Sequence, residues 1–416
     1  MSVCALDSLL EGDAYYQCPY PAFARLRDES PVHWHAASRS WLVARWEDAE
    51  TVLRAPRQYS SYGYQNAYFE RLRPELRAEA PTLELRGRTP TLITSDPPQH
   101  TRLRRLLQTA FTPKAIEALR PRVEALVSEL LDAFAGDPRA DLVAALAYPL
   151  PAMMIADILG VPRQDRDLFK QVSSDVVRFM NRTNPNTELT VEFARTADRS
   201  LADFRAYLRS LIEAHRERPR DDLLSTLVEA EFDGDTLEEE ELLANLVLFL
   251  IAGHETTTGL ISSAVYVLLQ HPAQLQAVSV DRARLPAAVA EALRFETPVQ
   301  RVRRVVSVEV SLGSVTIRAG EPAEILIGSA NRDPARFERA DEFDIAREPV
   351  PSLAFGKGVH RCIGESLALL EAETALSLLL DRYPELALAP GWEPGWSHLT
   401  NLRCLTSLSL SLTGAP

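Results

Sequence analysis

The chain has 416 residues, with 45 basic and 58 acidic side chains and a formal net charge of −13 at pH 7. This acidic balance argues against a nucleic-acid-binding protein, which usually carries a net basic domain. No apolar run reaches the roughly 20 residues that a membrane-spanning helix needs, and the N-terminus lacks a signal-peptide pattern. Its four cysteines are scattered and form no disulfide framework. We therefore expect a monomeric, cytoplasmic protein without a membrane anchor.

The spacing of apolar residues predicts a mainly α-helical fold with a minor β-sheet region, in a single domain over residues 1–416. The first predicted element is a hairpin of Val32–Trp34 and Trp41–Ala44, joined by a polar turn. Helices are predicted from Pro121 onward and over Ser200–Glu217, Glu239–Gln270, Leu285–Phe295 and Glu365–Asp381, and strands over Val305–Leu312, Val315–Ile317 and Glu324–Ile327.

The longest predicted helix contains a stretch, Leu242–Ile261, that is apolar on nearly all sides and should be centrally buried. The acidic run Glu238–Glu241 at its start complements the helix dipole, and we interpret it as a solvated first turn. Within the apolar stretch lies Ala252-Gly253-His254-Glu255-Thr256-Thr257. A carboxylate and several threonines are costly inside a buried helix, so this segment is either a functional site or a satisfied polar pocket.

One cysteine lies in a glycine-rich segment, FGKGVHRCIG, which runs from Phe355 to Gly364 and precedes a predicted helix. Glycines permit positive φ angles and close approach of another group to the backbone. A cysteine at a helix N-terminus is stabilised as the thiolate, and His360 and Arg361 add positive potential near Cys362. The pattern indicates a thiolate presented from a tight loop. A buried structural cysteine is the alternative, and a Cys–His nucleophile is disfavoured because the two residues are so close in sequence.

This segment resembles the haem-binding loop of the cytochrome P450 superfamily. The resemblance implies that Cys362 is the axial ligand of the haem iron, that Phe355 packs near the sulfur and that thiolate ligation favours O–O cleavage. The Ala252–Thr257 segment is similar to the oxygen-activating motif of the same family, which implies that Thr256 handles dioxygen and that Glu255 relays protons. The resemblance also assigns four small residues to the cofactor site: Ala252, Gly253, Gly356 and Gly364.

Basic residues occur where members of this superfamily bind the haem propionates. His100 and Arg104 follow Asp96-Pro-Pro with the family's spacing, and His360 lies within the cysteine loop. Arg304 matches another propionate position, with Arg303 as a close rival.

A helical Glu-x-x-Arg pair, Glu291 and Arg294, is similar to a structural ion pair of the family. Its expected third member is Arg347.

The resemblance extends from about residue 15 to the C-terminus and implies a P450 fold, with haem b between the long central helix and the cysteine loop. The implied activity is a haem-thiolate monooxygenase that inserts one oxygen atom of O2 into a small apolar substrate by hydroxylation or epoxidation. Terpenoids, steroids, fatty acids and polyketide-type specialised metabolites are candidate substrates. Aromatic residues and one methionine, in two regions, are expected to shape the substrate pocket: Tyr62, Tyr64, Tyr68, Phe69, Phe179, Met180 and Phe193.

The sequence carries no flavin or iron–sulfur fingerprint of a fused reductase. Electrons are therefore expected to come from NAD(P)H through a separate reductase and a ferredoxin-type donor, docked on a basic patch of Arg102, Arg105, Lys357 and Arg361.

Three alternatives remain open from the sequence: a peroxide-driven haem enzyme, a non-catalytic haem-binding or sensing protein, and ring formation, desaturation or C–C coupling on the same haem. The acid–alcohol pair Glu255-Thr256 counts against the first of these.

Overall fold

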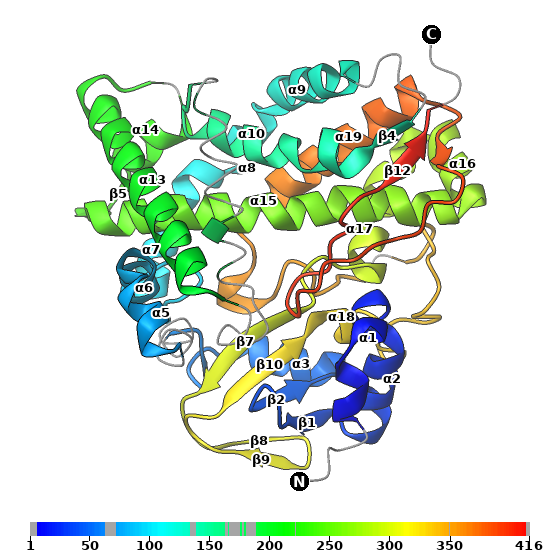
Figure 1. Ribbon diagram of the computed structural model, residues 1–416, viewed down its shortest axis with the longest axis horizontal. Helices are drawn as coiled ribbons and strands as arrows, with labels where there is room; N and C mark the ends of the chain where they lie inside the picture. Colours follow the sequence, from blue (N-terminus) through cyan, green and yellow to red (C-terminus); the bar gives the residue numbers. More distant parts are fainter. Residues whose placement is uncertain are drawn as a thin grey trace. The chain divides into compact units, whose positions relative to one another are not determined.

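The computed structural model describes residues 6–62, 72–133, 139–162, 165, 175–176, 179, 189–220, 222–348 and 350–412. Contacts divide the chain into two compact units. The first unit comprises Met1–Gln58, Glu117–Pro151 and Glu255–Pro416, and the second comprises Tyr59–Ile116 and Ala152–His254. Helices predominate and the strands are short, so the predicted mainly helical fold class is confirmed (Figure 1).

In the main sheet, the strands that belong to the first unit lie in the order β1-β2-β10-β7. Strands β1 (Val32–His35) and β2 (Ser40–Val43) form an antiparallel hairpin, which confirms the predicted one. Strand β10 (Pro322–Leu326) runs parallel to β2 and antiparallel to β7 (Arg301–Val306). Strands β2 and β10 are buried at most positions, as expected for inner strands that are covered on both faces.

The prediction of one strand over Val305–Leu312 is wrong. Strand β7 begins four residues earlier, at Arg301, and a separate strand β8 (Val310–Leu312) pairs with β9 (Val315–Ile317). The arginine-rich start of β7 does not look like a strand in sequence. It is stabilised in the sheet because Arg301 and Arg303 both form ion pairs with Glu324 of β10, with N–O distances of 3.1 and 3.0 Å.

A further small sheet of the first unit contains β11 (Ala387–Leu388), β12 (Ser409–Ser411) and β4 (Arg139–Asp141) in that order. The second unit contains the short strand β3 (Tyr59–Ser60) and the hairpin of β5 (Glu231–Phe232) and β6 (Asp235–Thr236).

Helix α19 (Glu365–Arg382), which follows the cysteine loop, packs on α9 (Arg120–Asp132) and α17 (Leu285–Phe295) in the first unit. The predicted bounds of α17 are confirmed, and those of α19 differ by one residue. The other α-helices described in this unit are α1 (Asp13–Gln17), α2 (Tyr20–Glu29), α3 (Trp46–Arg54), α16 (Pro272–Val280) and α18 (Ile327–Ala330). The unit also contains 3₁₀ turns at Asp7–Leu10, Arg282–Arg284 and Gly358–His360, and a π-helical turn at Val143–Ala147.

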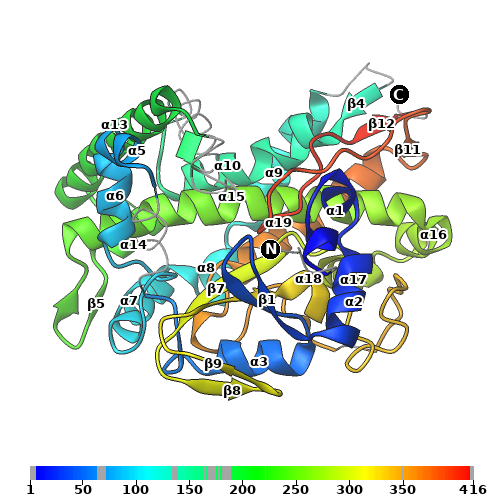
Figure 2. The same ribbon diagram turned by 60° about the horizontal axis from the view of Figure 1, so that its bottom comes forward.

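Helix α13 (Val191–Glu217) is the longest helix that lies wholly within the second unit, and it begins nine residues before the predicted Ser200. It packs on α5 (Pro74–Ala78), α6 (Pro81–Arg88) and α14 (Leu223–Val228). Figure 2 shows α5 and α6 beside α13. Among the described residues, this unit also contains α7 (Gln99–Gln108), a 3₁₀ turn at Thr109–Phe111 and nearly all of α8 (Pro113–Glu117). Helix α10 (Pro149–Ile158) begins in the first unit and continues into the second.

Helix α15 (Glu239–Gln270) has the predicted bounds and continues from the second unit into the first (Figure 1). By length and composition alone it could cross a membrane, but 67% of its apolar window is buried inside the protein. The core helix of a globular protein passes the same test, so this is weak evidence for a membrane span.

The interpretation of its acidic start as a solvated turn is correct only in part, because Glu238 and Glu240 are exposed whereas Glu241 is buried. Glu239 and Glu240 form ion pairs with Arg209 of α13, at 2.9 and 3.0 Å, and Glu241 pairs with Arg102 of α7 at 2.8 Å. These carboxylates therefore join the first turn of α15 to two neighbouring helices of the second unit.

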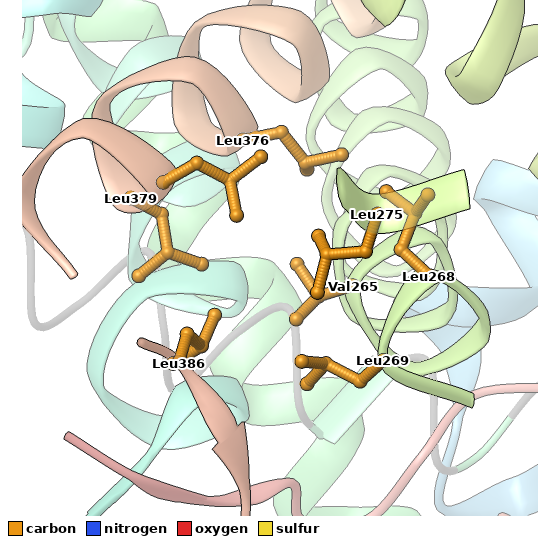
Figure 3. A pocket seen from close by; sticks show the side chains of 8 residues that line it. Val265, Leu268, Leu269, Leu275, Leu376, Leu379 and Leu386 are labelled. Carbon is orange, nitrogen blue, oxygen red and sulfur yellow. The ribbon is translucent and has the colours of Figure 1, made fainter. Parts of the chain in front are cut away.

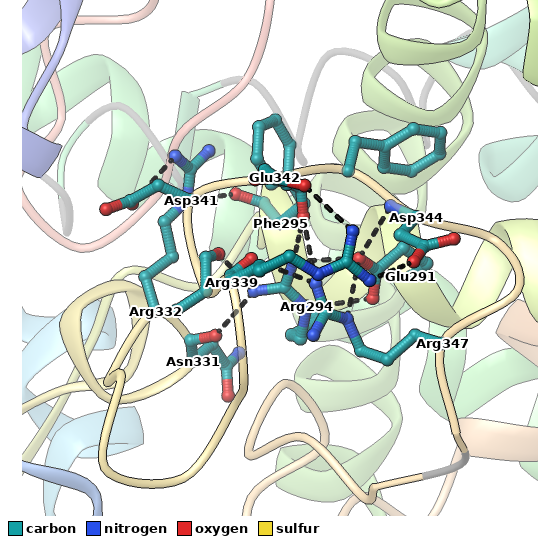
Figure 4. Close-up of polar contacts among 12 residues, drawn as sticks. Glu291, Arg294, Phe295, Asn331, Arg332, Arg339, Asp341, Glu342, Asp344 and Arg347 are labelled. Atoms are coloured by element: carbon teal, nitrogen blue, oxygen red, sulfur yellow. Dashed lines mark hydrogen bonds and ion pairs between the residues drawn. The ribbon is translucent and has the colours of Figure 1, made fainter.

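The predicted ion-pair cluster around α17 is confirmed, with Arg347 as its third member (Figure 4). Both carboxylate oxygens of Glu291 accept hydrogen bonds from Arg294 at 2.8 Å, and Arg347 Nε donates to Glu291 Oε1 at 3.1 Å. Glu291 and Arg294 are 6% and 2% exposed. Arg294 also donates to the carbonyls of Asn331, Ala340 and Glu342, which satisfies the remaining donors of this buried cation.

A small pocket in the first unit is lined only by aliphatic side chains from α15, α16, α19 and the following segment (Figure 3). It contains no polar group that could perform chemistry, so we assign it to the packing of these helices.

A buried carboxyl on α19 makes the stability of the fold depend on pH. Glu371 is 2% exposed, its Oε2 atom has no hydrogen-bond partner, and burial raises its pKa from 4.5 to about 8. The Glu371 carboxyl ionises at a lower pH in the unfolded chain than in the folded chain. The contribution of the protonated carboxyl to the stability of the fold is therefore complete below pH 4.5 and is lost progressively up to about pH 8. We expect the free energy of unfolding of the wild type to fall by ~4 kcal/mol relative to Glu371→Gln between pH 5 and 8.

Urea unfolding of the holoenzyme at several pH values measures this difference. Substitution of the exposed Glu385 by Gln is the matched control and should leave the pH profile unchanged. Parallel pH profiles of the wild type and Glu371→Gln would contradict a neutral buried carboxyl.

Candidate active site

The cysteine loop is closed by backbone hydrogen bonds between its two ends. The amide of Cys362 donates to the carbonyl of Phe355 at 2.9 Å, and the amide of Gly356 donates to the carbonyl of Leu353 at 2.8 Å. Cys362 is exposed and lies three residues before the first residue of α19. The loop therefore presents the sulfur outward, close to the N-terminus of a helix that stabilises negative charge.

Two glycines of this loop are required by the backbone. Gly356 and Gly358 have φ angles of +70° and +69°, in the left-handed region that favours glycine. A Cβ atom at Gly358 would also lie 2.5 Å from the carbonyl oxygen of Leu53 in α3. Gly364 differs, because a Cβ atom there would lie 4.0 Å from Cys362 Sγ and meet nothing closer within the described chain. The space beside the sulfur is thus left open by the protein.

The middle of α15 carries an accessible stripe on an otherwise mostly buried helix. Ala252 is exposed, while Phe249, Gly253 and Thr256 are half-buried, and these positions share one helix face. Most of their neighbours in the helix are buried. A helix that is open at its centre rather than at its ends is typical of a cofactor or ligand site.

Burial alters the chemistry of the Glu255 carboxyl. It raises the pKa of this group above its ordinary value. The negative charge of Glu255 also contributes, after burial, to the raised pKa of Tyr148, which is about 12. A carboxyl whose pKa is shifted upward can take up and release a proton closer to neutral pH than an exposed one.

A contact that no sequence pattern predicts holds this part of α15 in place. Cys404 is buried, and its thiol donates a hydrogen bond to the carbonyl oxygen of Glu255 at 3.6 Å. Gly259 makes room for it, because a Cβ atom there would lie 2.9 Å from both Cys404 Sγ and Pro298 Cβ. Burial raises the pKa of the Cys404 thiol, so the proton that this hydrogen bond needs is retained.

The two adjacent arginines of β7 lie on opposite faces of the strand, since side chains alternate along it. Arg303 faces Glu324, its register partner in β10, and forms an ion pair with it at 3.0 Å. Arg304 is 8% exposed, and its Nη1 atom donates to the carbonyl of Arg303 at 2.7 Å. The structure therefore distinguishes the two candidate propionate-binding residues: they lie on opposite faces of β7, and Arg303 already binds a carboxylate.

His100 and Arg104 lie one turn apart on α7 of the second unit, as predicted. His100 is 1% exposed and Arg104 is half-buried. The residues Phe355, His360 and Cys362 belong to the first unit, where they share one loop.

Comparisons with known proteins identify the family. The cytochrome P450 family model matches residues 64–391. Cytochrome P450 107B1 of Saccharopolyspora erythraea is 39% identical over 387 residues, which cover 92% of this chain and 92% of that protein. The chain belongs to the cytochrome P450 family.

Two further proteins agree with this assignment. The cytochrome P450 monooxygenase PikC of Streptomyces venezuelae is 40% identical over 401 residues, covering 94% of this chain and 91% of PikC. The crystal structure of CYP109E1 from Bacillus megaterium in complex with testosterone matches with a TM-score of 0.84 at 33% identity, covering 95% of this chain and 99% of that one. The protein is a cytochrome P450 monooxygenase. Haem is the prosthetic group of this family.

The residues of this P450 fit a haem. Cys362 has an exposed sulfur atom, and a Cβ atom at Gly364 would meet nothing closer than that sulfur within the described chain, so the loop has a donor atom with space beside it. Thr256 of the same unit is half-buried and has a small side chain. Sulfur is a donor that iron accepts readily as the thiolate.

The predicted pocket and docking residues are placed only in part. Phe179 is fully buried, Phe193 is half-buried and Tyr62 is 61% exposed, whereas Tyr64, Tyr68, Phe69 and Met180 lie outside the described residues.

Three of the four predicted docking cations already have acidic partners, namely Arg102 with Asp235 and Glu241, Lys357 with Glu50, and Arg361 with Glu365.

The close packing of Cys404 and Pro298 against Gly259 can be tested by adding a methyl group at residue 259. Alanine normally stabilises a helix relative to glycine. At this position Gly259→Ala is expected instead to lower the free energy of unfolding by roughly 1–3 kcal/mol, because the new Cβ displaces Cys404 and Pro298. Thermal or urea unfolding of the two single variants and the double variant Gly259→Ala/Cys404→Ala measures the coupling. The double variant should recover part of the loss, and strictly additive effects would contradict the contact.

Proposed function

We propose that this monooxygenase binds haem b through Cys362 and inserts one oxygen atom of O2 into an apolar organic molecule by hydroxylation or epoxidation. The observation that carries the proposal is the exposed sulfur of Cys362, held by a closed loop at the N-terminus of α19. The family membership of the chain supports it. The 95% coverage of this chain by CYP109E1 also supports one P450 domain over residues 1–416.

When bound, the haem would supply the redox chemistry that activates dioxygen. The protein's contribution at the sulfur is to keep Cys362 deprotonated, by the N-terminus of α19 and the positive potential of the loop. Gly356 and Gly358 hold the loop in the conformation that presents the sulfur.

Glu255 and Thr256 would deliver protons at the open centre of α15. The raised pKa of Glu255 allows its carboxyl to hold a proton and pass it on, and the Thr256 hydroxyl is the adjacent donor and acceptor. The thiol of Cys404 holds the Glu255 carbonyl, and so keeps this segment of α15 in place.

Basic side chains would neutralise the two haem propionates. We assign this role to His100 and Arg104 of α7, to His360 and to Arg304. Arg304 is preferred to Arg303 because the Arg303 guanidinium already forms an ion pair with Glu324.

Electrons are inferred to come from NAD(P)H through a ferredoxin-type donor, and the enzyme is inferred to act as a cytoplasmic monomer. The ion pairs of Arg102, Lys357 and Arg361 reduce the positive charge available for docking. A substrate with a large apolar body is supported by the testosterone bound to CYP109E1.

The ligand assignment predicts a spectroscopic signature. The ferrous–CO complex of the wild type is expected to show the thiolate-type Soret band, because thiolate ligation is what distinguishes this haem class. Cys362→His should lose that band, while substitution of the exposed Cys18 by Ser should keep it. A wild-type spectrum without the thiolate band would refute the proposed function.

The proton-delivery role predicts a loss of coupling between electron input and product. In Thr256→Ala, NAD(P)H consumption should continue while product per NAD(P)H falls severalfold and hydrogen peroxide rises, because a proton donor is missing. Thr256→Ser should restore coupling, and Thr257→Val, at the neighbouring buried threonine, is the control. Wild-type coupling in Thr256→Ala would rule out this role.

A further inference from the structure

Two arginines are buried in the second unit, on helices that pack together. Arg86 of α6 is 2% exposed and Arg205 of α13 is 5% exposed. Figure 2 shows these two helices side by side. Burial of even one guanidinium group is unusual unless the group is paired.

The buried donors of this pair lack acceptors. The Nε and Nη1 atoms of Arg86 and the Nη1 atom of Arg205 are buried without a hydrogen-bond partner in the structure described. Arg205 donates through Nη2 to Glu240, whereas no ion pair to Arg86 occurs among the described residues. The cluster therefore holds two positive charges against one carboxylate.

Several other charged groups on α5, α6 and α13 are already engaged. Arg77 and Arg88 both bind Glu84, at 2.8 and 2.6 Å, and Asp198 of α13 accepts a hydrogen bond from the amide of Leu83 at 2.8 Å. The pKa of Arg86 is lowered to about 10 by burial and then by the positive charge of Arg205, with no acidic group opposing the shift. Arg86 still carries its charge at neutral pH.

A buried, charged and unpaired guanidinium costs considerable free energy, and a matching anion removes that cost. Guanidinium donors lie in a planar fork that suits the two oxygens of a carboxylate, or the oxygens of a phosphate. We propose that Arg86, with Arg205 beside it, binds the anionic head group of an otherwise apolar substrate. This inference rests on the proposed function, because it takes the ligand to be the substrate of the monooxygenase.

The head-group preference tests the site directly. Three probes with the same alkyl chain, dodecanoate, dodecyl phosphate and dodecan-1-ol, are titrated calorimetrically into the purified holoenzyme. At least one of the two anions should bind the wild type roughly tenfold more tightly than the alcohol, the range of a hydrogen bond to a charged group. The tighter of the two anions identifies the head group as a carboxylate or a phosphate.

Two variants locate the effect. Arg86→Met keeps the length of the side chain without its charge, and should abolish the preference for the anion over the alcohol. Arg88→Met is the matched control on the same helix, because its side chain is 61% exposed, and it should keep the preference. Equal binding of acid and alcohol by the wild type, or an unchanged preference in Arg86→Met, would overturn the proposal.

Thermal unfolding separates binding from folding. Without ligand, Arg86→Met should have a higher Tm than the wild type, because an unpaired buried charge has been removed. Dodecanoate or dodecyl phosphate should raise the Tm of the wild type and not that of Arg86→Met. A lower Tm of ligand-free Arg86→Met would show that the guanidinium is structural and would count against the site. These measurements need no turnover, so they remain informative if the thiolate spectrum fails.

Discussion

The buried ion pair between Glu291 and Arg294 is the interaction on which the cysteine loop depends. Arg294 donates to the carbonyl of Asn331 at 3.0 Å, and the side-chain oxygen of Asn331 accepts from the amide of Leu353 at 2.7 Å. The carbonyl of Leu353 in turn accepts from the amide of Gly356, within the loop that presents the sulfur. A continuous series of hydrogen bonds thus leads from α17 to the loop. Loss of either charge would leave its partner buried and unpaired.

Helix α15 meets a second constraint, because it must be apolar enough to form the core and polar enough to handle protons. Buried apolar residues and accessible polar residues occupy different parts of the helix. Leu242–Leu248 and Thr257–Leu268 are buried, whereas Ala252 and Thr256 between them open one face and Glu255 keeps a raised pKa. Cys404 then holds the segment through a backbone carbonyl, which leaves both polar side chains available for chemistry.

Much of the fold and of the proposed site could be predicted from the sequence, because these features are encoded by short local patterns. The period of apolar residues predicted α15 and α17 with the observed bounds, and the glycine spacing around Cys362 predicted the loop. The start of β7 was missed because Arg301 and Arg303 make it look polar, and only Glu324 on another strand compensates for their charge.

The sequence by itself determined the family, the cysteine loop and the acid–alcohol pair, since each depends on residues that are close along the chain. The tertiary structure alone decided which charges are satisfied. It paired Arg303 with Glu324, engaged the acidic start of α15 with arginines of other helices, and left Arg86 buried beside Arg205. The reason is physical: the free energy of a charge depends on its burial and on partners that are distant in sequence, and no local pattern records either of them.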